Sequence, residues 1–338
     1  MMNKWMNTVT ALLCLGFAMQ ASAKNCTEVR AGIDMGSGTT KIQVSEVNVC
    51  NRTLGKVLFS QERPIGFNED LAESGNTQLS PAIQQQGMTT LKALVSQAEK
   101  FHPKRITGVA TAVFRAASNG QQVIRQFNQQ AHVTIRIITQ KQEAELGFIS
   151  AKAALNDPKL KDSDLLVWDI GGGSMQMTTY DRIDGFKTPE IYEGKLASVS
   201  LKDMVIEVMM NKNLTQVNSP NPIGSLAGEI LRFVNFYART HVPAEIKQAA
   251  KSRKVVGIGG VHGYSIKEQL HPLNNQYTAA DLDRVAQVKI NQTDAQLPGD
   301  YRATDVTNLL LVEGFMQALG IPQVTLVKAN LIQGILLK

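Results

Sequence analysis

Short runs of β-branched residues alternate with helically spaced apolar residues along the first half of the chain. The β-branched runs predict three successive strands, at 28–35, 40–49 and 54–61. Ser80 and Pro81 are the residue types that cap and begin a helix, and the apolar residues after them keep helical spacing. A strand, a helix, a strand and a long helix should follow, at 105–110, 119–131, 133–138 and 140–155.

The second half repeats this order of elements. A strand at 165–170, a glycine turn at 171–174 and a strand at 175–180 open it. Helices are then expected at 201–210, 223–240, 279–288 and 305–319, and strands at 255–258 and 324–327. Strands that come first, with helices interleaved later, indicate an α/β fold for each half. We therefore predict a signal peptide at 1–23 and two α/β domains, at 24–140 and 141–338.

One supersecondary unit occurs twice in the chain. Residues 33–40 read IDMGSGTT, and residues 168–175 read WDIGGGSM. Both have an apolar strand end, an aspartate, an apolar residue, Gly-x-Gly, a hydroxyl residue and a second strand. This internal repeat predicts two similar domains that face each other across a cleft.

The two glycine turns have the features of phosphate-binding loops. Glycine lets a ligand approach the backbone closely, successive N–H groups form a nest for phosphate oxygens, and hydroxyl side chains add donors. The predicted phosphate-binding residues of the turns are Gly36, Ser37, Gly38, Thr39, Gly171, Gly172, Gly173 and Ser174. A tight Asp-x-Gly hairpin needs no ligand, so the prediction depends on two copies that occur in matching contexts.

Charged side chains close to the turns are candidates for chemistry. Asp34 and Asp169 end their strands, where a carboxylate can hold a hydrated Mg²⁺ ion or a water molecule. Lys41 and Arg115 can bind phosphate, although both also fit ordinary surface positions. Glu143 begins the helix at 140–155, where it either favours the helix dipole or takes a proton from an attacking water.

The N-terminus has the pattern of a Sec signal peptide. Residues 1–23 contain one cation, an uncharged apolar stretch and the small residues Ala-Ser-Ala, with a buried core helix as the alternative. The chain after residue 23 keeps two cysteines, Cys26 and Cys50. In an antiparallel hairpin centred on Gly38 these would face each other, and an oxidising compartment would join them. We therefore expect a disulfide in a periplasmic or secreted protein, with two unpaired thiols as the alternative.

The charge of the chain limits its partners. A formal net charge of +6 suits anionic ligands without requiring nucleic acid. We expect no nucleic-acid partner and no membrane span, because no segment after residue 23 is long and apolar enough to cross a bilayer. The oligomeric state stays open, with a homodimer as one alternative.

Taken in order, these motifs resemble the exopolyphosphatase/guanosine pentaphosphate phosphatase family, which belongs to the wider superfamily of acetate kinase, sugar kinases and actin-like ATPases. The matching stretches are 32–38, 109–111 with Arg115 and Asn119, 137–139 with Glu143, 167–174 and 256–260. They cover most of the chain after residue 23, and the length is that of the short two-domain members. The resemblance implies two actin-like (ribonuclease H-like) domains and hydrolysis of a phosphoanhydride substrate.

The resemblance also implies roles for single residues. Both glycine turns would hold the terminal phosphates of the substrate, with help from Lys41 and Arg115. Glu143 matches the proposed catalytic glutamate that activates water, and Asp169 would hold the Mg²⁺ cofactor. Amides, cations and the divalent ion would stabilise the charge of the transition state.

Three positions depart from the family pattern. Gln176 replaces a glutamate, Val261 a threonine and Ile332 an arginine. The loss of two charges from a phosphate site leaves a non-catalytic binder or sensor of phosphate-rich anions as the alternative function. A kinase or ATPase is a third hypothesis, which export would oppose because ATP is scarce outside the cytoplasm.

Overall fold

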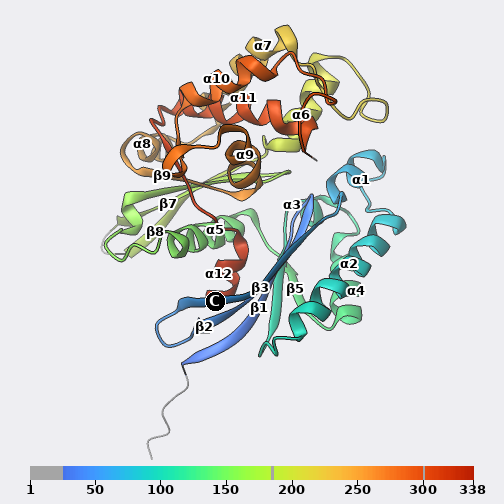
Figure 1. Cartoon of the computed structure of the whole chain (residues 1–338), viewed down its shortest axis with the longest axis vertical. Helices are drawn as coiled ribbons and strands as arrows, with labels where there is room; N and C mark the ends of the chain where they lie inside the picture. The colour runs from blue at the N-terminus through green and yellow to red at the C-terminus, as the bar shows by residue number, and fades with distance from the viewer. Residues whose placement is uncertain (1–25, 184–185, 300) are drawn as a thin grey trace, which may run out of the picture.

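The computed structural model describes residues 26–183, 186–299 and 301–338, so the predicted signal peptide lies outside the described residues. The chain forms two α/β halves, each built on its own sheet, and Figure 1 shows one half above the other. Sheet A has the strand order β3-β2-β1-β4-β5, and sheet B has the order β10-β11-β9-β6-β7-β8. The central strand of sheet B, Leu165–Ile170, begins with four buried apolar residues, and the last five residues of the central strand of sheet A, Thr27–Met35, are also buried.

Sheet A begins with an antiparallel meander and continues with strands parallel to β1. Its strands are β1 (Thr27–Met35), β2 (Thr39–Asn48), β3 (Thr53–Pro64), β4 (Ile106–Ala110) and β5 (Thr134–Ile137). The helices α2 (Pro81–Glu99) and α4 (Gly120–Ala131) cover one face, where they form the core of this half. The short helices α1 (Phe67–Glu73) and α3 (Ala112–Ala116) lie beside the cleft.

Sheet B repeats the first three strands of this arrangement, with β6 antiparallel to β7 and parallel to β9. Its strands are β6 (Leu165–Ile170), β7 (Met175–Ile183), β8 (Phe186–Gly194), β9 (Lys254–Ile258), β10 (Gln276–Tyr277) and β11 (Val324–Leu326). Its main helices are α6 (Ser198–Met204), α7 (Ala227–His241), α8 (Ala244–Ser252), α9 (Lys267–Leu270), α10 (Ala279–Lys289) and α11 (Arg302–Leu319). The largest apolar core of the described residues lies between this sheet and α6, α7 and α11.

Two helices connect the halves. The helix α5 (Gln140–Leu155) packs Phe148 and Ala151 against sheet B, and Leu146 against the last helix, α12 (Leu331–Leu337). Figure 1 shows α12 returning to sheet A. There Ile332 lies so close to Gly32 of β1 that a Cβ added to the glycine would be 2.6 Å from it. The end of the chain therefore completes the first half.

The structure confirms most predicted elements and corrects others. The segment predicted as one helix at 201–210 is α6 followed by a π-helical turn at Val205–Met209. The sequence analysis missed α8, α12 and β8. β8 contains Pro189, which an edge strand tolerates but which hides the strand pattern. None of the described helices combines the length and the apolar composition needed to cross a bilayer.

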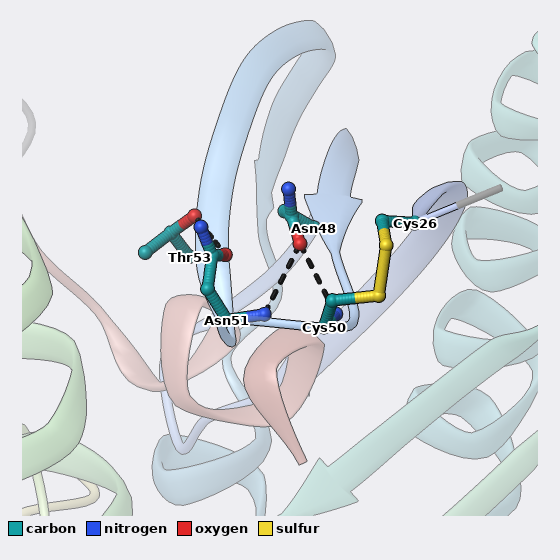
Figure 2. The surroundings of a disulfide bond; sticks show 5 residues. All are labelled: Cys26, Asn48, Cys50, Asn51 and Thr53. Atoms are coloured by element: carbon teal, nitrogen blue, oxygen red, sulfur yellow. Dashed lines mark hydrogen bonds between the residues drawn. A yellow bond between two sulfur atoms is a disulfide. The ribbon is translucent and has the colours of Figure 1, made fainter. Parts of the chain in front are cut away.

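Cys26 and Cys50 form the predicted disulfide, with their Cα atoms 5.4 Å apart (Figure 2). The predicted register was wrong by one residue. The backbone N–H of Val49 donates to the carbonyl of Cys26 at 2.7 Å, so Val49 faces Cys26 and Cys50 lies one position beyond it. The turn pairs Met35 with Thr40 across an even number of loop residues, so the hairpin is centred on a peptide bond and not on Gly38.

Candidate active site

The two glycine turns have the same backbone hydrogen bonds. The N–H of Gly36 donates to the carbonyl of Thr39 at 2.9 Å, and the N–H of Gly171 donates to the carbonyl of Ser174 at 3.0 Å. A helix braces each turn, since Asn68 of α1 donates to Ser37 at 3.0 Å. The corresponding bond from Val199 of α6 to Gly172 is 2.9 Å long. The sequence repeat is therefore also a repeat of local geometry.

The turns face each other across a shared cleft. A Cβ added to Gly173 would be 3.2 Å from the hydroxyl oxygen of Ser37, and one added to Gly172 would be 3.8 Å from the Cβ of Ser37. A cavity of about 240 Å³ lies between the halves and is lined by both turns. The prediction of two similar domains facing across a cleft is confirmed.

Most of the predicted site residues line this one cavity. They are Asp34, Gly36, Ser37, Gly38, Thr39, Lys41, Glu143, Asp169, Gly171, Gly172, Gly173 and Ser174. Arg115 differs from the rest, because it does not line the cavity formed by the described residues. It lies behind Glu143, where its Nη1 donates to a Glu143 carboxylate oxygen at 2.8 Å and to the carbonyl of Ile138 at 2.9 Å.

Glu143 lies in the first turn of α5 and lines the cavity. The capping box of Thr139 and Gln142 fixes the start of this helix, so the Glu143 carboxylate does not serve as its cap. Glu143 is buried, and this burial raises its pKa, whereas the ion pair with Arg115 opposes the rise. Arg115 therefore favours the deprotonated form that a general base requires.

Asp169 shares the cavity with Glu143 and is also desolvated. Burial, together with the nearby carboxylates of Glu143 and Asp34, raises the pKa of Asp169 to about 7. Two glycines crowd its side chain: a Cβ on Gly259 would be 2.2 Å from one carboxylate oxygen, and one on Gly147 would be 3.3 Å from the other. Gly259 also has a φ of +84°, so its backbone conformation and its contact with Asp169 both favour glycine.

The cavity is rich in carboxylates. Seven acidic residues line it, namely Asp34, Glu62, Glu69, Glu143, Asp169, Glu268 and Asp305, whereas Lys41 is the only Lys or Arg among its described lining residues. Such a surface repels a bare polyphosphate anion but fits a cation that arrives with one. No three His, Cys, Asp or Glu of the described chain converge on one metal position. Mg²⁺ is often held by one or two carboxylates, water and substrate phosphates.

The three departures from the family pattern are placed as follows. Gln176 is buried beside the second turn, and its amide donates to the hydroxyl of Ser174 at 3.1 Å. Ile332 packs into the apolar contact between α12 and β1 and lies outside the cavity. Val261 lines the cavity next to Gly259. The missing arginine is thus replaced by a residue that serves the packing of α12.

Several cavity residues have no motif that marks them in the sequence. Asn68 and Ser198 stand at the starts of α1 and α6, whereas Tyr264, Asp305 and Asn308 come from segments near and after β9. The only available signal is position, since Asn68 and Ser198 begin the helices that brace the two turns. His262 lies nearby but belongs to the core, where burial lowers its pKa to about 3 and its Nδ1 shares a hydrogen bond of 2.7 Å with the hydroxyl of Tyr277.

Comparisons with known proteins agree with this architecture. The sequence profile of the Ppx/GppA phosphatase family matches residues 48–214. The crystal structure of the Aquifex aeolicus Ppx/GppA family member is similar with a TM-score of 0.70 at 14% identity, over 92% of this chain and 97% of that one. An exopolyphosphatase-like protein has a TM-score of 0.70 at 18% identity, over 92% and 97%.

An exopolyphosphatase from Cytophaga hutchinsonii has a TM-score of 0.67 at 17% identity, over 91% of this chain and 96% of that one. At such identities the structures show the fold, and the profile matches just under half of the chain. The predicted fold class, α/β with two similar domains that face each other across a cleft, is confirmed. The paired glycine turns that face each other across one cleft, together with the match over residues 48–214, make the chain similar to the Ppx/GppA phosphatase family.

Proposed function

We propose that the protein is an exported phosphatase that hydrolyses the terminal phosphoanhydride bond of polyphosphate or a related polyphosphorylated compound. The observation that carries this proposal is the position of Glu143, whose buried carboxylate lies in the same cavity as both glycine turns and is paired with Arg115 at 2.8 Å. The family and the exopolyphosphatase relatives support the substrate class.

In the proposed reaction Glu143 removes a proton from a water molecule as the water oxygen attacks the terminal phosphorus. The bond between that phosphorus and the bridging oxygen breaks. The shortened chain leaves with the bridging oxygen, which keeps the electron pair of the broken bond. Amides of the two turns and the ammonium of Lys41 bind the non-bridging oxygens, which carry the spread charge of the transition state. Asp169 would hold Mg²⁺, which neutralises phosphate charge when bound.

The main test is phosphate release from polyphosphate with Mg²⁺. Glu143→Gln should lower kcat by about 10²- to 10⁴-fold, the usual contribution of a general base. Glu145→Gln is the matched control, because Glu145 lies on the same helix but does not line the cavity. A Glu143→Gln variant that keeps its activity would contradict the role of Glu143.

A second candidate function is binding without turnover, as a sensor of phosphate-rich anions. The observation in its favour is the loss of two charges, since Gln176 and Ile332 replace a glutamate and an arginine of the family pattern. Tight binding of polyphosphate by the wild-type protein, with no phosphate released, would select this function over hydrolysis.

Export is supported by the pattern of residues 1–23 and by the disulfide between Cys26 and Cys50. When the full chain is expressed in a bacterium with a Sec system, the protein should appear in the periplasmic fraction with its N-terminus near Lys24. N-terminal sequencing measures this directly. An uncleaved chain in the cytoplasm would count against export.

A further inference from the structure

Lys41 lies in a row of charged residues on sheet A. In the strand register Lys41 is opposite Asp34 of β1 on one side and opposite Glu62 of β3 on the other. Residues in register share one face of a sheet, with their Cβ atoms about 5 Å apart. All three line the cavity, so Lys41, the one Lys or Arg among the described lining residues, has a carboxylate on each side.

The ammonium of Lys41 is nevertheless unpaired. Within the described residues it has neither a hydrogen bond nor an ion pair, although its charge acts on the carboxylates of Asp34 and Asp169. The ammonium lies 5.8 Å from the centroid of the Tyr264 ring. Glu62 is instead engaged by Tyr264, whose hydroxyl donates to the Glu62 carboxylate at 2.9 Å. This hydrogen bond crosses the cleft from the segment after β9 to β3.

The contact between Tyr264 and Glu62 also lies between two cavities. Lys41, Glu62 and Tyr264 line the cavity between the two glycine turns and also a neighbouring cavity of about 700 Å³. Burial and the neighbouring Glu62 carboxylate raise the pKa of Tyr264, so the phenol stays protonated and can act as the donor. The ring of the same tyrosine attracts the ammonium weakly.

We infer that Tyr264 is a positioning residue for Lys41, resting on the proposed function of this site: it occupies the Glu62 carboxylate and so leaves the Lys41 ammonium available to substrate phosphate. Without the phenol hydroxyl, Glu62 regains a free carboxylate next to Lys41. The lysine then pairs with Glu62, and a phosphate anion must compete for it. In a cavity with one lining lysine, this competition weakens anion binding directly.

The test measures binding of inorganic tripolyphosphate with Mg²⁺ by calorimetry. All proteins carry Glu143→Gln, so that the probe is not consumed. Tyr264→Phe, which keeps the ring and removes the hydroxyl, should raise Kd about fivefold, the upper range for a competing ion pair at a partly exposed site. Adding Glu62→Gln to Tyr264→Phe should bring Kd back to the reference value, because the competing charge is gone.

The double variant separates positioning from a structural role. If Tyr264 only holds the two halves together, Glu62→Gln cannot restore binding, because the hydrogen bond across the cleft is still missing. Glu99→Gln, at the exposed end of α2, serves as the charge-matched control. An unchanged Kd in Tyr264→Phe, or a raised Kd that Glu62→Gln does not relieve, overturns the inference.

The readout also separates this inference from the proposed function. If the wild-type protein releases no phosphate but the binding pattern appears, hydrolysis fails and the role of Tyr264 stands. If the wild-type protein hydrolyses polyphosphate and the pattern is absent, only the role of Tyr264 fails. A reference protein that does not bind tripolyphosphate at all overturns both.

Discussion

The two glycine hairpins have the same backbone hydrogen bonds in their turns, but one has a charged side chain where the other has a neutral one. Asp34 of the first hairpin pairs in register with Lys41, and Asp169 of the second pairs with Gln176. Lys41 reaches the cleft with an unpaired ammonium, whereas Gln176 is 1% exposed and bonds to the turn beside it. The same position is therefore used for charge in one half and for packing in the other.

The difference extends to the next strand of each half. β4 and β9 are both parallel neighbours of the hairpin's first strand. The segment after β4 supplies Arg115, which pairs with Glu143 behind the cavity, whereas the segment after β9 lines the cavity with Gly259, Gly260 and Val261. The first half thus contributes Lys41 to the cavity and Arg115 behind it, and the second half contributes backbone and close packing around Asp169. The two halves of a duplicated fold can thus contribute different chemical groups to one site.

The difference between the two hairpins is tested most directly by placing the residue of the first hairpin in the second. Gln176→Lys should lower the free energy of unfolding by about 3 kcal/mol, because an ammonium would be buried where Gln176 has no access to water. Denaturant unfolding measures the change. Gln176→Met is the uncharged control of similar length, for which the loss of one hydrogen bond predicts about 1 kcal/mol.

An unchanged stability of Gln176→Lys would mean that the second hairpin can hold a cation, through water or through Asp169. Burial would then not explain why residue 176 is uncharged, and it would not account for the difference between the two hairpins.

The sequence shows the repeat but not the division of work. The β-branched runs and glycine turns predict β1, β2, β6 and β7, because short local patterns determine hairpins. The helix α12 could not be predicted, since it has only seven residues, one of them a glycine, and its helical state depends on packing against β1. Local patterns thus predicted most strands and the longer helices, and they missed elements such as β8 and α12.

The residues of the candidate site also form two groups, one that the sequence predicts and one that it does not. Residues inside or next to the glycine motifs were found, because their chemistry and their position coincide in the sequence. Tyr264 and Glu62 meet across 202 positions of sequence, and no local pattern records such a contact. Arg115 was predicted to bind phosphate, a role that stays a prediction, but its location behind Glu143 depends on how α5 crosses the end of β4.

The smaller test therefore concerns Arg115, the second cation of the first half. Arg115→Met removes the partner that opposes the raised pKa of Glu143, so this pKa rises further. A general base must be deprotonated, and the acid limb of the kcat–pH profile should move to higher pH by about one unit. Arg136→Met, on the exposed side of β5, is the matched control. If Arg115 instead binds substrate phosphate, KM rises and the acid limb stays where it is, which would place the arginine with Lys41 as a ligand and not with Glu143 as its support.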